Sequence, residues 1–437
     1  MAHLELNILD LGGIIHPGLV KYPLMTKEAQ TFDITPTDLA FGGEALGRLP
    51  DGRIAFVPYA LPGEAVRAQM IEDKRDFARL RLLEVLSPSP QRLQPRCPHF
   101  TVCGGCQYQH LPYALQLEVK AGLLRQQLER AGGIKSPPVA DAVPSPSLWN
   151  YRNHVQFHLD PQGKLGFEAP RSHQVIPVRE CHLPQEAINA VWPQISLEPL
   201  PGLKQVSLRT DTDEEVLVIL ESSTGELPEF TVEDLTVSAV LLGPAGALSL
   251  AGSDHLDYQI LDCSFRVSAA SFFQVNTAQA GAMVEHLLTN LPLTPQTTLL
   301  ELYSGVGLFS AFLASRVSQL VAVEASPSAC QDFESNLEEF DNVELYEASV
   351  EQVLPSLSLQ PDILLADPPR SGLGRKVIEG ILVSKAPTLA YVSCDPATLA
   401  RDSRQLIEGG FHLEKVTPFD LFPQTYHIES ISLWQRN

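Results

Sequence analysis

The spacing of apolar and polar positions divides the chain into segments of different periodicity. Residues 31–87 hold short apolar runs separated by turn residues, and about five short strands there predict a small β-barrel. Residues 111–133 follow helical spacing and end in Gly-Gly, which predicts one helix. Between about residue 150 and 262 the pattern is mostly strand-like, as in NHVQFHLD and VLVILES, and predicts a mixed central region.

From Ser271 onward, apolar strands alternate with helical patterns. The strand-like runs are TLLEL, QLVAVE, DILLA and TLAYVS, and each is followed by a helical stretch or a turn. This β-α-β-α order predicts an α/β fold with a doubly wound, mostly parallel sheet. We therefore expect four parts: a poorly ordered N-terminal extension (1–28), an OB-like barrel (29–90), a mixed α+β central domain (91–265) and the parallel-sheet domain (266–437).

Composition and charge narrow the class of protein. The chain has 437 residues, 44% of them hydrophobic and 19% charged, which is an ordinary globular balance. No run approaches the 18 or so apolar residues of a membrane span, and the first residues lack a secretory pattern, so we expect a cytoplasmic protein. The net charge of −21 by itself argues against nucleic acid as a partner.

The charge is unevenly distributed, however. Residues 48–182 carry 17 Lys and Arg against 12 Asp and Glu, so the front of the chain is mildly basic while the remainder is strongly acidic. Five basic residues cluster in the predicted barrel and could face an RNA backbone: Arg67, Lys74, Arg75, Arg79 and Arg81. The alternative is an ordinary solvated barrel face.

A glycine turn follows the strand TLLEL and predicts a nucleoside site. Gly305 and Gly307 allow the backbone to approach a ligand, and Glu324 ends the next strand, where an acid can bind a ribose diol. Ser310 stands where a dinucleotide site has its third glycine, and no phosphate-binding lysine follows. These features favour a nucleoside without phosphates, such as S-adenosylmethionine; a glycine turn with a surface glutamate is the alternative.

Two further strand ends carry candidate chemistry. Asp367 precedes Pro-Pro-Arg, and Arg370 stands where amino-group methyltransferases have an aromatic residue, which argues against methylation of an exocyclic amine. Cys394 lies between a strand and a helix start, a position that lowers a thiol pKa and favours a nucleophile over a buried inert thiol. Glu429 lies among apolar residues, where burial would raise its pKa toward that of a base.

Methylation of uracil at C5 needs this set of groups. Carbon C5 is too weak a nucleophile to take a methyl group from a sulfonium unaided. A thiolate that adds to C6 creates an enolate with electron density at C5, and a base then removes the C5 proton.

Three of the seven cysteines lie within ten residues. The spacing is Cys97-x5-Cys103-x2-Cys106, and Cys181 is the best fourth candidate. Four thiolates suit tetrahedral zinc or a [4Fe–4S] cluster. An odd cysteine count without a secretion signal disfavours structural disulfides.

The ordered motifs resemble the RNA uracil-C5 methyltransferase family. They are FFQVN (272–276), LYSGVGLF (302–309), VAVE (321–324), ADPPRSG (366–372), SCDPATLARD (393–402) and FPQTYHIE (422–429). FGGEALGR (41–48) and DGRIAFVPYALPGE (51–64) resemble the TRAM domain, the N-terminal RNA-binding barrel of this family. The cysteine stretch resembles that of the iron–sulfur members, which act largely on large-subunit ribosomal RNA.

The resemblance implies roles for individual residues. Cys394 is the implied nucleophile and Glu429 the implied base, with S-adenosylmethionine as methyl donor. The implied cofactor contacts are Gln274, Tyr303, Glu324 and Asp367, and the implied ligands of a [4Fe–4S] cluster are Cys97, Cys103, Cys106 and Cys181. The helix at 111–133 is implied to pack on the catalytic domain.

The expected function is therefore methyl transfer to C5 of one uridine in RNA. We expect a monomer acting on 23S ribosomal RNA, with the target uridine extruded from a folded structure. Three alternatives stay open: a transfer-RNA T-loop methyltransferase, a non-catalytic RNA-binding iron–sulfur protein, and a small-molecule or amine methyltransferase.

Overall fold

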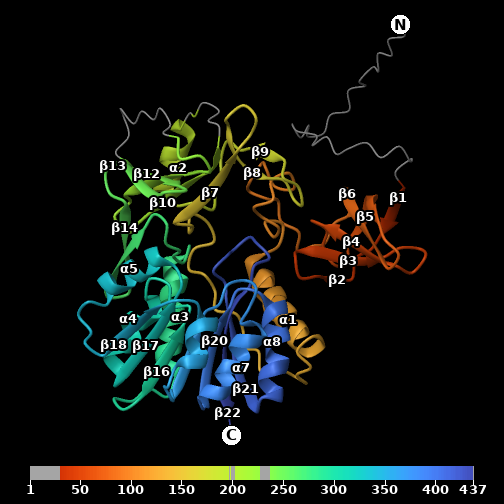
Figure 1. The fold of residues 1–437 in the computed structure, drawn as a ribbon. Coiled ribbons are helices and arrows are strands. Elements are labelled where there is room, and N and C mark those ends of the chain that lie inside the picture. The colour runs from red at the N-terminus through yellow and green to blue at the C-terminus, as the bar shows by residue number, and fades with distance from the viewer. Residues whose placement is uncertain (1–29, 196, 198–201, 227–236, 437) are drawn as a thin grey trace.

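The computed structural model describes residues 30–195, 197, 202–226 and 237–436. The predicted extension at 1–28 lies outside these residues. Three sheets follow one another along the chain and form separate bodies in Figure 1. The first is a small β-domain, the second belongs to the centre of the chain, and the third carries the C-terminal half.

The first sheet has six strands and fits the predicted OB-like barrel. Its strands are β1 (Thr31–Ile34), β2 (Asp38–Leu39), β3 (Glu44–Arg48), β4 (Ile54–Pro58), β5 (Ala65–Asp73) and β6 (Phe77–Ser87), in the order β1-β5-β6-β4-β3-β2. Alternate residues such as Val66, Ala68, Ala78 and Leu80 are fully buried, which is the two-residue period of a half-buried sheet. These residues form one small core of their own.

The cysteine stretch follows the barrel and leads into helix α1 (Tyr113–Arg130). Leu123, Leu124 and Leu128 of this helix share a core with residues of the third sheet, including Trp434. Helix α1 therefore packs on the third sheet and on helix α8 (Pro396–Glu408), which covers that sheet. In the sequence, however, α1 follows the barrel and the cysteines (Figure 1).

The central sheet is almost entirely antiparallel. Its described strands are β7 (His154–Leu159), β8 (Leu165–Glu168), β9 (Val175–Pro177), β10 (Leu203–Thr210), β11 (Val216–Ser222), β12 (Val237–Gly243) and β13 (Gly246–Ala251), in the order β13-β12-β11-β10-β7-β8-β9. Helix α2 (Glu186–Val191) and the 3-10 turn Trp192–Gln194 cover one face, where Phe157, Ile188 and Trp192 meet in the core. A hairpin of β14 (His255–Ile260) and β15 (Cys263–Ser268) then leads to the third sheet.

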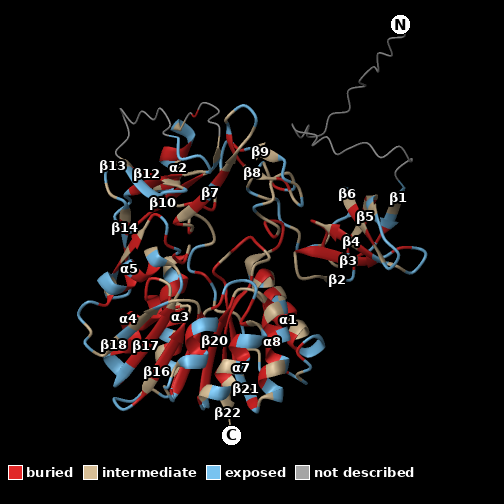
Figure 2. Cartoon of the chain, in the orientation of Figure 1, coloured by how far each residue is buried: buried red, intermediate tan, exposed pale blue. Residues whose placement is uncertain are grey.

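The third sheet is doubly wound and mostly parallel, as predicted. Its strands are β16 (Thr298–Leu302), β17 (Gln319–Glu324), β18 (Val343–Glu347), β19 (Ile363–Ala366), β20 (Thr388–Ser393), β21 (Phe411–Phe419) and β22 (Glu429–Arg436), in the order β18-β17-β16-β19-β20-β22-β21. Strands β16 to β20 are parallel, whereas β22 runs antiparallel between β20 and β21. The strands are mostly buried (Figure 2).

Helices lie on both faces of this sheet. They are α3 (Thr277–Asn290), α4 (Leu308–Leu313), α5 (Pro327–Asn336), α6 (Val350–Val353), α7 (Gly374–Ser384) and α8, with 3-10 turns at Ala314–Arg316 and Leu354–Ser356. Two separate apolar clusters, one on each face, account for the nearly continuous apolar sequence of the strands. Among the described helices, none combines the length and apolar character needed to cross a membrane.

Candidate active site

The predicted catalytic pair lies at one edge of the third sheet. Cys394 follows β20 directly, and Glu429 is the first residue of β22. Because β20 and β22 are antiparallel with Ser393 paired to Ser430, the next residues along, Cys394 and Glu429, also face each other across the two strands. Parallel strands end at this same edge, so Glu324, the last residue of β17, and Asp367, directly after β19, lie there as well.

The glycine turn after β16 lies at the same edge of the sheet as Cys394 and Glu429. Gly307 has a φ of +88°, and a Cβ there would lie 2.4 Å from Leu337 Cδ1, so only glycine fits. A Cβ on Gly305 would meet nothing within 4 Å, which leaves open space beside the backbone. Tyr303 also has a left-handed φ, of +62°, in the same turn.

Backbone amides fix the Glu324 carboxylate in place. Oε1 accepts hydrogen bonds from the N–H groups of Ala325 (2.8 Å) and Ser326 (2.7 Å), and Oε2 accepts one from Gly305 N–H (2.9 Å). A carboxylate has about four acceptor positions, so Oε2 retains capacity for one more donor. This is the acceptor that the sequence predicts for a ribose hydroxyl.

Two buried carboxyl groups at the site have raised pKa values. Burial raises the pKa of Asp367 to about 7. Burial also raises the pKa of Glu429 well above its usual value, and the neighbouring Asp367 raises it further, whereas Arg370 lowers it. With only 4% of its surface exposed, Glu429 is suited to hold a proton that an ordinary exposed carboxyl group would release.

The prediction of a lowered thiol pKa at Cys394 is wrong for the protein alone. Burial raises this pKa to about 12, and the carboxyl groups of Glu429 and Asp367 add to the effect, against a smaller lowering by Arg370. The helix start does not offset this, because the Asp395 side chain caps α8 by accepting from the N–H groups of Ala397 and Thr398. A positive charge beside the thiol would be needed to ionise it near neutral pH.

The segment between β15 and α3 contains Gln274, an implied cofactor contact, and Phe272, which the sequence did not single out. Gln274 is 8% exposed, and its carbonyl oxygen accepts a hydrogen bond from Asn153 Nδ2 at 3.0 Å. Phe272, two residues earlier, is 69% exposed. An aromatic ring that remains so open beside a buried polar segment is a candidate stacking partner for a base, and the FFQVN motif was the only signal for it.

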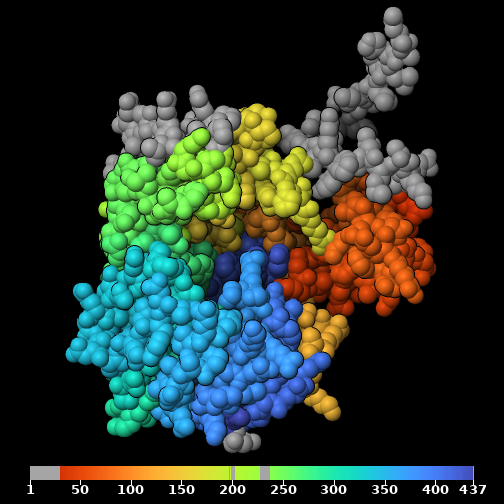
Figure 3. All heavy atoms as spheres, viewed as in Figure 1, coloured from red at the N-terminus to blue at the C-terminus, as the bar shows by residue number. Residues whose placement is uncertain are grey.

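The molecule is hollowed above this edge of the sheet. In Figure 3 the hollow lies between the central sheet, the third sheet and the barrel, so all three bodies border it. Strand β22 begins on this side, since its end at the C-terminus points the opposite way (Figure 1). A folded polymer could therefore reach the catalytic edge from the hollow.

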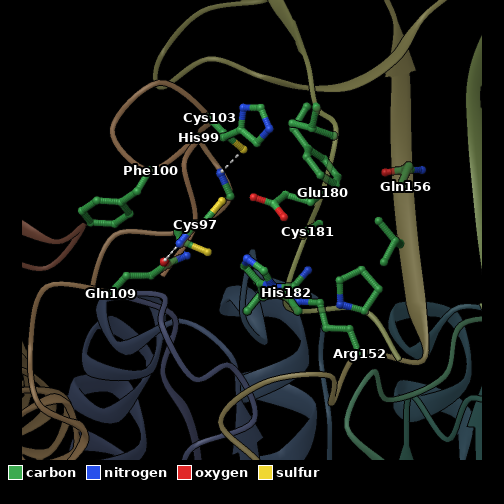
Figure 4. A pocket seen from close by; sticks show the side chains of 17 residues that line it. Cys97, His99, Phe100, Cys103, Gln109, Arg152, Gln156, Glu180, Cys181 and His182 are labelled. Carbon is green, nitrogen blue, oxygen red and sulfur yellow. Dashed lines mark hydrogen bonds between the residues drawn. The ribbon is translucent and has the colours of Figure 1, made fainter. Parts of the chain in front are cut away.

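The four predicted metal ligands line one cavity. Cys97, Cys103 and Cys106 come from the stretch after the barrel, and Cys181 comes from the connection between β9 and α2. The cavity has a volume of about 240 Å³, and Figure 4 shows Cys97, Cys103 and Cys181 around it. The four thiols form a sulfur donor set brought together from two distant parts of the chain.

The spacing of these groups does not suit a single ion. Among the described residues, no three His, Cys, Asp or Glu side chains converge closely enough to hold one metal ion. Tetrahedral zinc with Zn–S bonds of about 2.3 Å would need the sulfur atoms within about 4 Å of one another.

Most of the barrel's basic side chains that were predicted to face RNA form ion pairs with carboxylates. Arg67 pairs with Asp33 (2.9 Å) and Glu84 (3.2 Å). Arg79 pairs with Glu44 and Glu72, and Lys74 also pairs with Glu72. Arg75 is exposed and has no ion pair within the described part of the chain. The barrel therefore presents much less free positive charge than its count of basic residues suggests.

Comparisons with known proteins agree with this arrangement. The family model described as tRNA (Uracil-5-)-methyltransferase matches residues 253–437, and the TRAM domain model matches residues 26–83. An "Uncharacterized RNA methyltransferase" of Aquifex aeolicus is 34% identical over 92% of this chain and 97% of its own. A second protein of that name, from Gloeobacter violaceus, is 30% identical over 94% of this chain and 97% of its own.

A solved structure shares the fold. The tRNA (uracil-54, C5)-methyltransferase of Pyrococcus abyssi, solved with S-adenosyl-L-homocysteine, superposes with a TM-score of 0.71 at 24% identity and covers 92% of this chain and 100% of its own. Together with the relatives of 30% and 34% identity, the matched models confirm the resemblance seen in the motifs. The chain belongs to the RNA uracil-5 methyltransferase family and carries an N-terminal TRAM domain.

Proposed function

We propose that this protein methylates C5 of one uridine in RNA, with Cys394 as the nucleophile and Glu429 as the base. The observation that carries the proposal is the strand register that sets Cys394 opposite Glu429 at the sheet edge where Glu324 and Asp367 also end. The raised pKa of Glu429 supports its role, because a base that must accept a proton from carbon needs more basicity than an ordinary carboxylate has.

The proposed reaction balances in three steps. The Cys394 thiolate bonds to C6 and pushes the C5=C6 electron pair toward C5 and the O4 enolate. Carbon C5 would then bond to the methyl group of a sulfonium donor as the donor's S–CH3 bond breaks and its electron pair stays on the sulfur. The Glu429 carboxylate accepts the C5 proton. The electrons of the broken C5–H bond restore C5=C6 as the S–C6 bond breaks, so the thiolate is released unchanged.

We propose S-adenosylmethionine as the methyl donor. When bound, it supplies an activated methyl group on a sulfonium, whose positive charge would favour ionisation of a nearby thiol. The contacts proposed for it are Gln274, Tyr303, Glu324 and Asp367. The free acceptor position on Glu324 and the open space at Gly305 support a ribose at this point.

The cysteines are proposed to hold a [4Fe–4S] cluster. The proposed ligands are Cys97, Cys103, Cys106 and Cys181, and the cavity that all four of them line supports the assignment. Iron and sulfide analysis of protein purified without oxygen should give about four of each per chain, with the broad visible absorbance of such clusters. Stoichiometric zinc without iron would contradict the proposal.

The RNA partner is proposed to be large-subunit ribosomal RNA. The resemblance of the cysteine stretch to the iron–sulfur members supports this choice, and the barrel and central domain (29–90 and 91–265) are the proposed RNA-holding parts. Transfer RNA is the second candidate, because the structural neighbour from Pyrococcus abyssi acts on tRNA uracil-54. Mapping 5-methyluridine in both RNAs from a deletion strain separates the two: the missing modification identifies the substrate.

The catalytic assignment can be tested with two variants and labelled methyl donor. Cys394→Ala should abolish methyl transfer and form no covalent protein–RNA complex, because no sulfur can add to C6. Glu429→Gln should also stop turnover but accumulate a covalent complex, since addition and methyl transfer precede proton removal. Methyl transfer by Cys394→Ala at the rate of the unmodified protein would refute the proposed nucleophile.

A further inference from the structure

The loop between β21 and β22 delivers Glu429 to the site, and one residue in it has an unusual backbone. Gln424 has a φ of +70°, in the left-handed region that few residues other than glycine adopt. It is also 4% exposed. A strained, buried residue persists only where its surroundings hold it, and such positions cluster at functional sites.

Helix α1 holds Gln424 through a reciprocal pair of side-chain and backbone bonds. The N–H of Gln424 donates to Oε1 of Gln116 at 3.0 Å, and Nε2 of Gln116 donates to Oε1 of Gln424 at 3.1 Å. Gln116 is 1% exposed and also donates to the carbonyl oxygens of Tyr108 (3.2 Å) and Leu111 (3.1 Å). Both amide groups are thus shielded from water, where their hydrogen bonds are strongest.

The cysteine stretch holds the same residue from the other side. The N–H groups of Gln107 and Tyr108, directly after Cys106, both donate to the carbonyl oxygen of Gln424, at 3.0 and 2.9 Å. The Gln107 side chain extends the link, because its Nε2 donates to Gly104 O at 2.7 Å and its Oε1 accepts from Tyr426 N at 3.4 Å. Gly104 lies between Cys103 and Cys106.

We infer that Gln424 is a positioning residue for Glu429, and that the cysteine stretch acts on the reaction by holding the β21–β22 loop through it. Four of the bonds named above, two with Gln116 and one each from Gln107 and Tyr108, are made by Gln424, five residues before the proposed base. The inference rests on the proposed function of Glu429. It means that the segment from Cys97 to Tyr108 affects the rate of the reaction by positioning the loop, without any electron transfer. The proton-removal step depends on this loop, whereas thiol addition by Cys394, at the end of β20, does not.

The test uses the full chain and follows two readouts, the steady-state rate and the covalent protein–RNA complex. Gln424→Asn suits the backbone, because asparagine tolerates the left-handed region, but its side chain is too short to reach Gln116. We expect kcat to fall about 10- to 100-fold with the KM for RNA changed by less than about twofold, since small misplacements of a catalytic group have effects of this size. The covalent complex should accumulate, as in Glu429→Gln.

Three further variants keep the outcome decisive. Gln424→Glu retains the acceptor for Gln116 and should recover kcat to within about threefold of the unmodified protein, and Gln116→Ala should reproduce Gln424→Asn from the partner side. Gln296→Ala is the matched control, because Gln296 is exposed at the opposite edge of the sheet before β16. Thermal unfolding of each variant checks that the chain has folded.

The results separate this inference from the proposed function. If Glu429→Gln forms no covalent complex, the proposed function fails and this inference with it. If Glu429→Gln accumulates the complex but Gln424→Asn and Gln116→Ala turn over at the normal rate, only the inference is overturned. A loss of both turnover and complex formation in folded Gln424→Asn also overturns it, because the thiol step would then have been lost.

Discussion

The thiol of Cys394 lies among negative groups, and Arg370 is the cation that counteracts them. Burial, Glu429 and Asp367 all raise the pKa of the thiol, and Arg370 lowers it. The same arginine lowers the pKa of Glu429. One exposed side chain therefore favours the deprotonated form of both proposed catalytic groups.

Removing this cation should slow the reaction near neutral pH. In Arg370→Gln, the pKa values of Cys394 and Glu429 both rise, so a smaller fraction of each is deprotonated. We expect kcat/KM at pH 7.5 to fall about three- to tenfold, because exposed charges contribute up to about 1 kcal/mol, and the pH–rate profile to shift toward alkaline pH. Arg375→Gln, at an exposed position on α7, is the control; equal profiles for both variants would contradict the role of Arg370.

Burial of Glu429 should make the protein less stable as the pH rises. Its pKa is raised in the folded state, so its contribution is fully favourable below the unfolded value near 4.5 and is lost as the pH rises through the folded value. Glutamine does not titrate. The unfolding temperature of Glu429→Gln should therefore match that of the unmodified protein near pH 4.5 and exceed it at pH 8.

A thermal scan at several pH values checks this difference. Glu347→Gln is a suitable control because Glu347 is exposed at the end of β18. If the advantage of Glu429→Gln is the same at all pH values, the buried carboxyl group does not titrate as stated.

At the scale of elements, a buried ion pair joins helix α1 to the loop that carries the base. Lys120 Nζ lies 2.5 Å from Asp420 Oδ1, and these side chains are 2% and 0% exposed. Lys120 also donates to the Phe422 carbonyl oxygen at 3.0 Å. Burial lowers the pKa of Lys120, and Asp420 opposes that shift. The charge on each partner is tolerated because the other is present.

Breaking this ion pair should destabilise the domain that is built on the third sheet. Lys120→Met leaves the Asp420 carboxylate buried without its cation, which typically costs about 3–5 kcal/mol. We expect the midpoint of thermal unfolding to fall by roughly 5–10 °C. The double variant Lys120→Met/Asp420→Leu should recover most of this loss, because no unpaired charge remains. If the double variant is no more stable than the single one, lost packing rather than charge explains the effect.

Periodicity predicted the elements well where the contacts are local. Helix α1 occupies Tyr113–Arg130 within the predicted 111–133, and β11 occupies Val216–Ser222, the predicted VLVILES. The catalytic edge was predictable too, because parallel strands end on one side. The Gln116–Gln424 pair was not, since 308 residues separate its members and neither has a distinctive neighbourhood in the sequence. The raised pKa of Cys394 escaped prediction for the same reason: it depends first on burial in the folded chain and then on carboxyl groups at the start of β22 and after β19.

At the scale of the whole molecule, RNA must approach a chain whose net charge is −21. The segment between β15 and α3 offers an exposed aromatic ring, Phe272, but the barrel's cations Arg67 and Arg79 are already paired with carboxylates. Binding of this kind relies on shape and stacking more than on counterion release. The number of basic residues overestimates the free positive charge on the barrel, because a sequence does not show which charged side chains form ion pairs.

The salt dependence of RNA binding should therefore be shallow. We expect the slope of log K against log salt concentration to be no steeper than about −4, which corresponds to few phosphate contacts. Phe272→Ala should weaken binding by about 1–3 kcal/mol, the usual value of stacking on a base, whereas Arg67→Ala should change it little. Titrations of labelled substrate RNA at several salt concentrations measure the salt slope and the effects of both substitutions on affinity. A steep slope would show that phosphate contacts dominate.

The antiparallel insertion of β22 also bears on the order of assembly. Strand β21 leaves the ribosome before β22, yet β22 must enter between β20 and β21 to complete the sheet. Until it does, the hydrogen-bonding edge of β20 has no neighbour on that side, and the sulfur at its tip has no carboxylate opposite. Until β22 enters the last gap in the sheet, a nascent chain therefore keeps Cys394, the proposed nucleophile, apart from Glu429, the proposed proton acceptor.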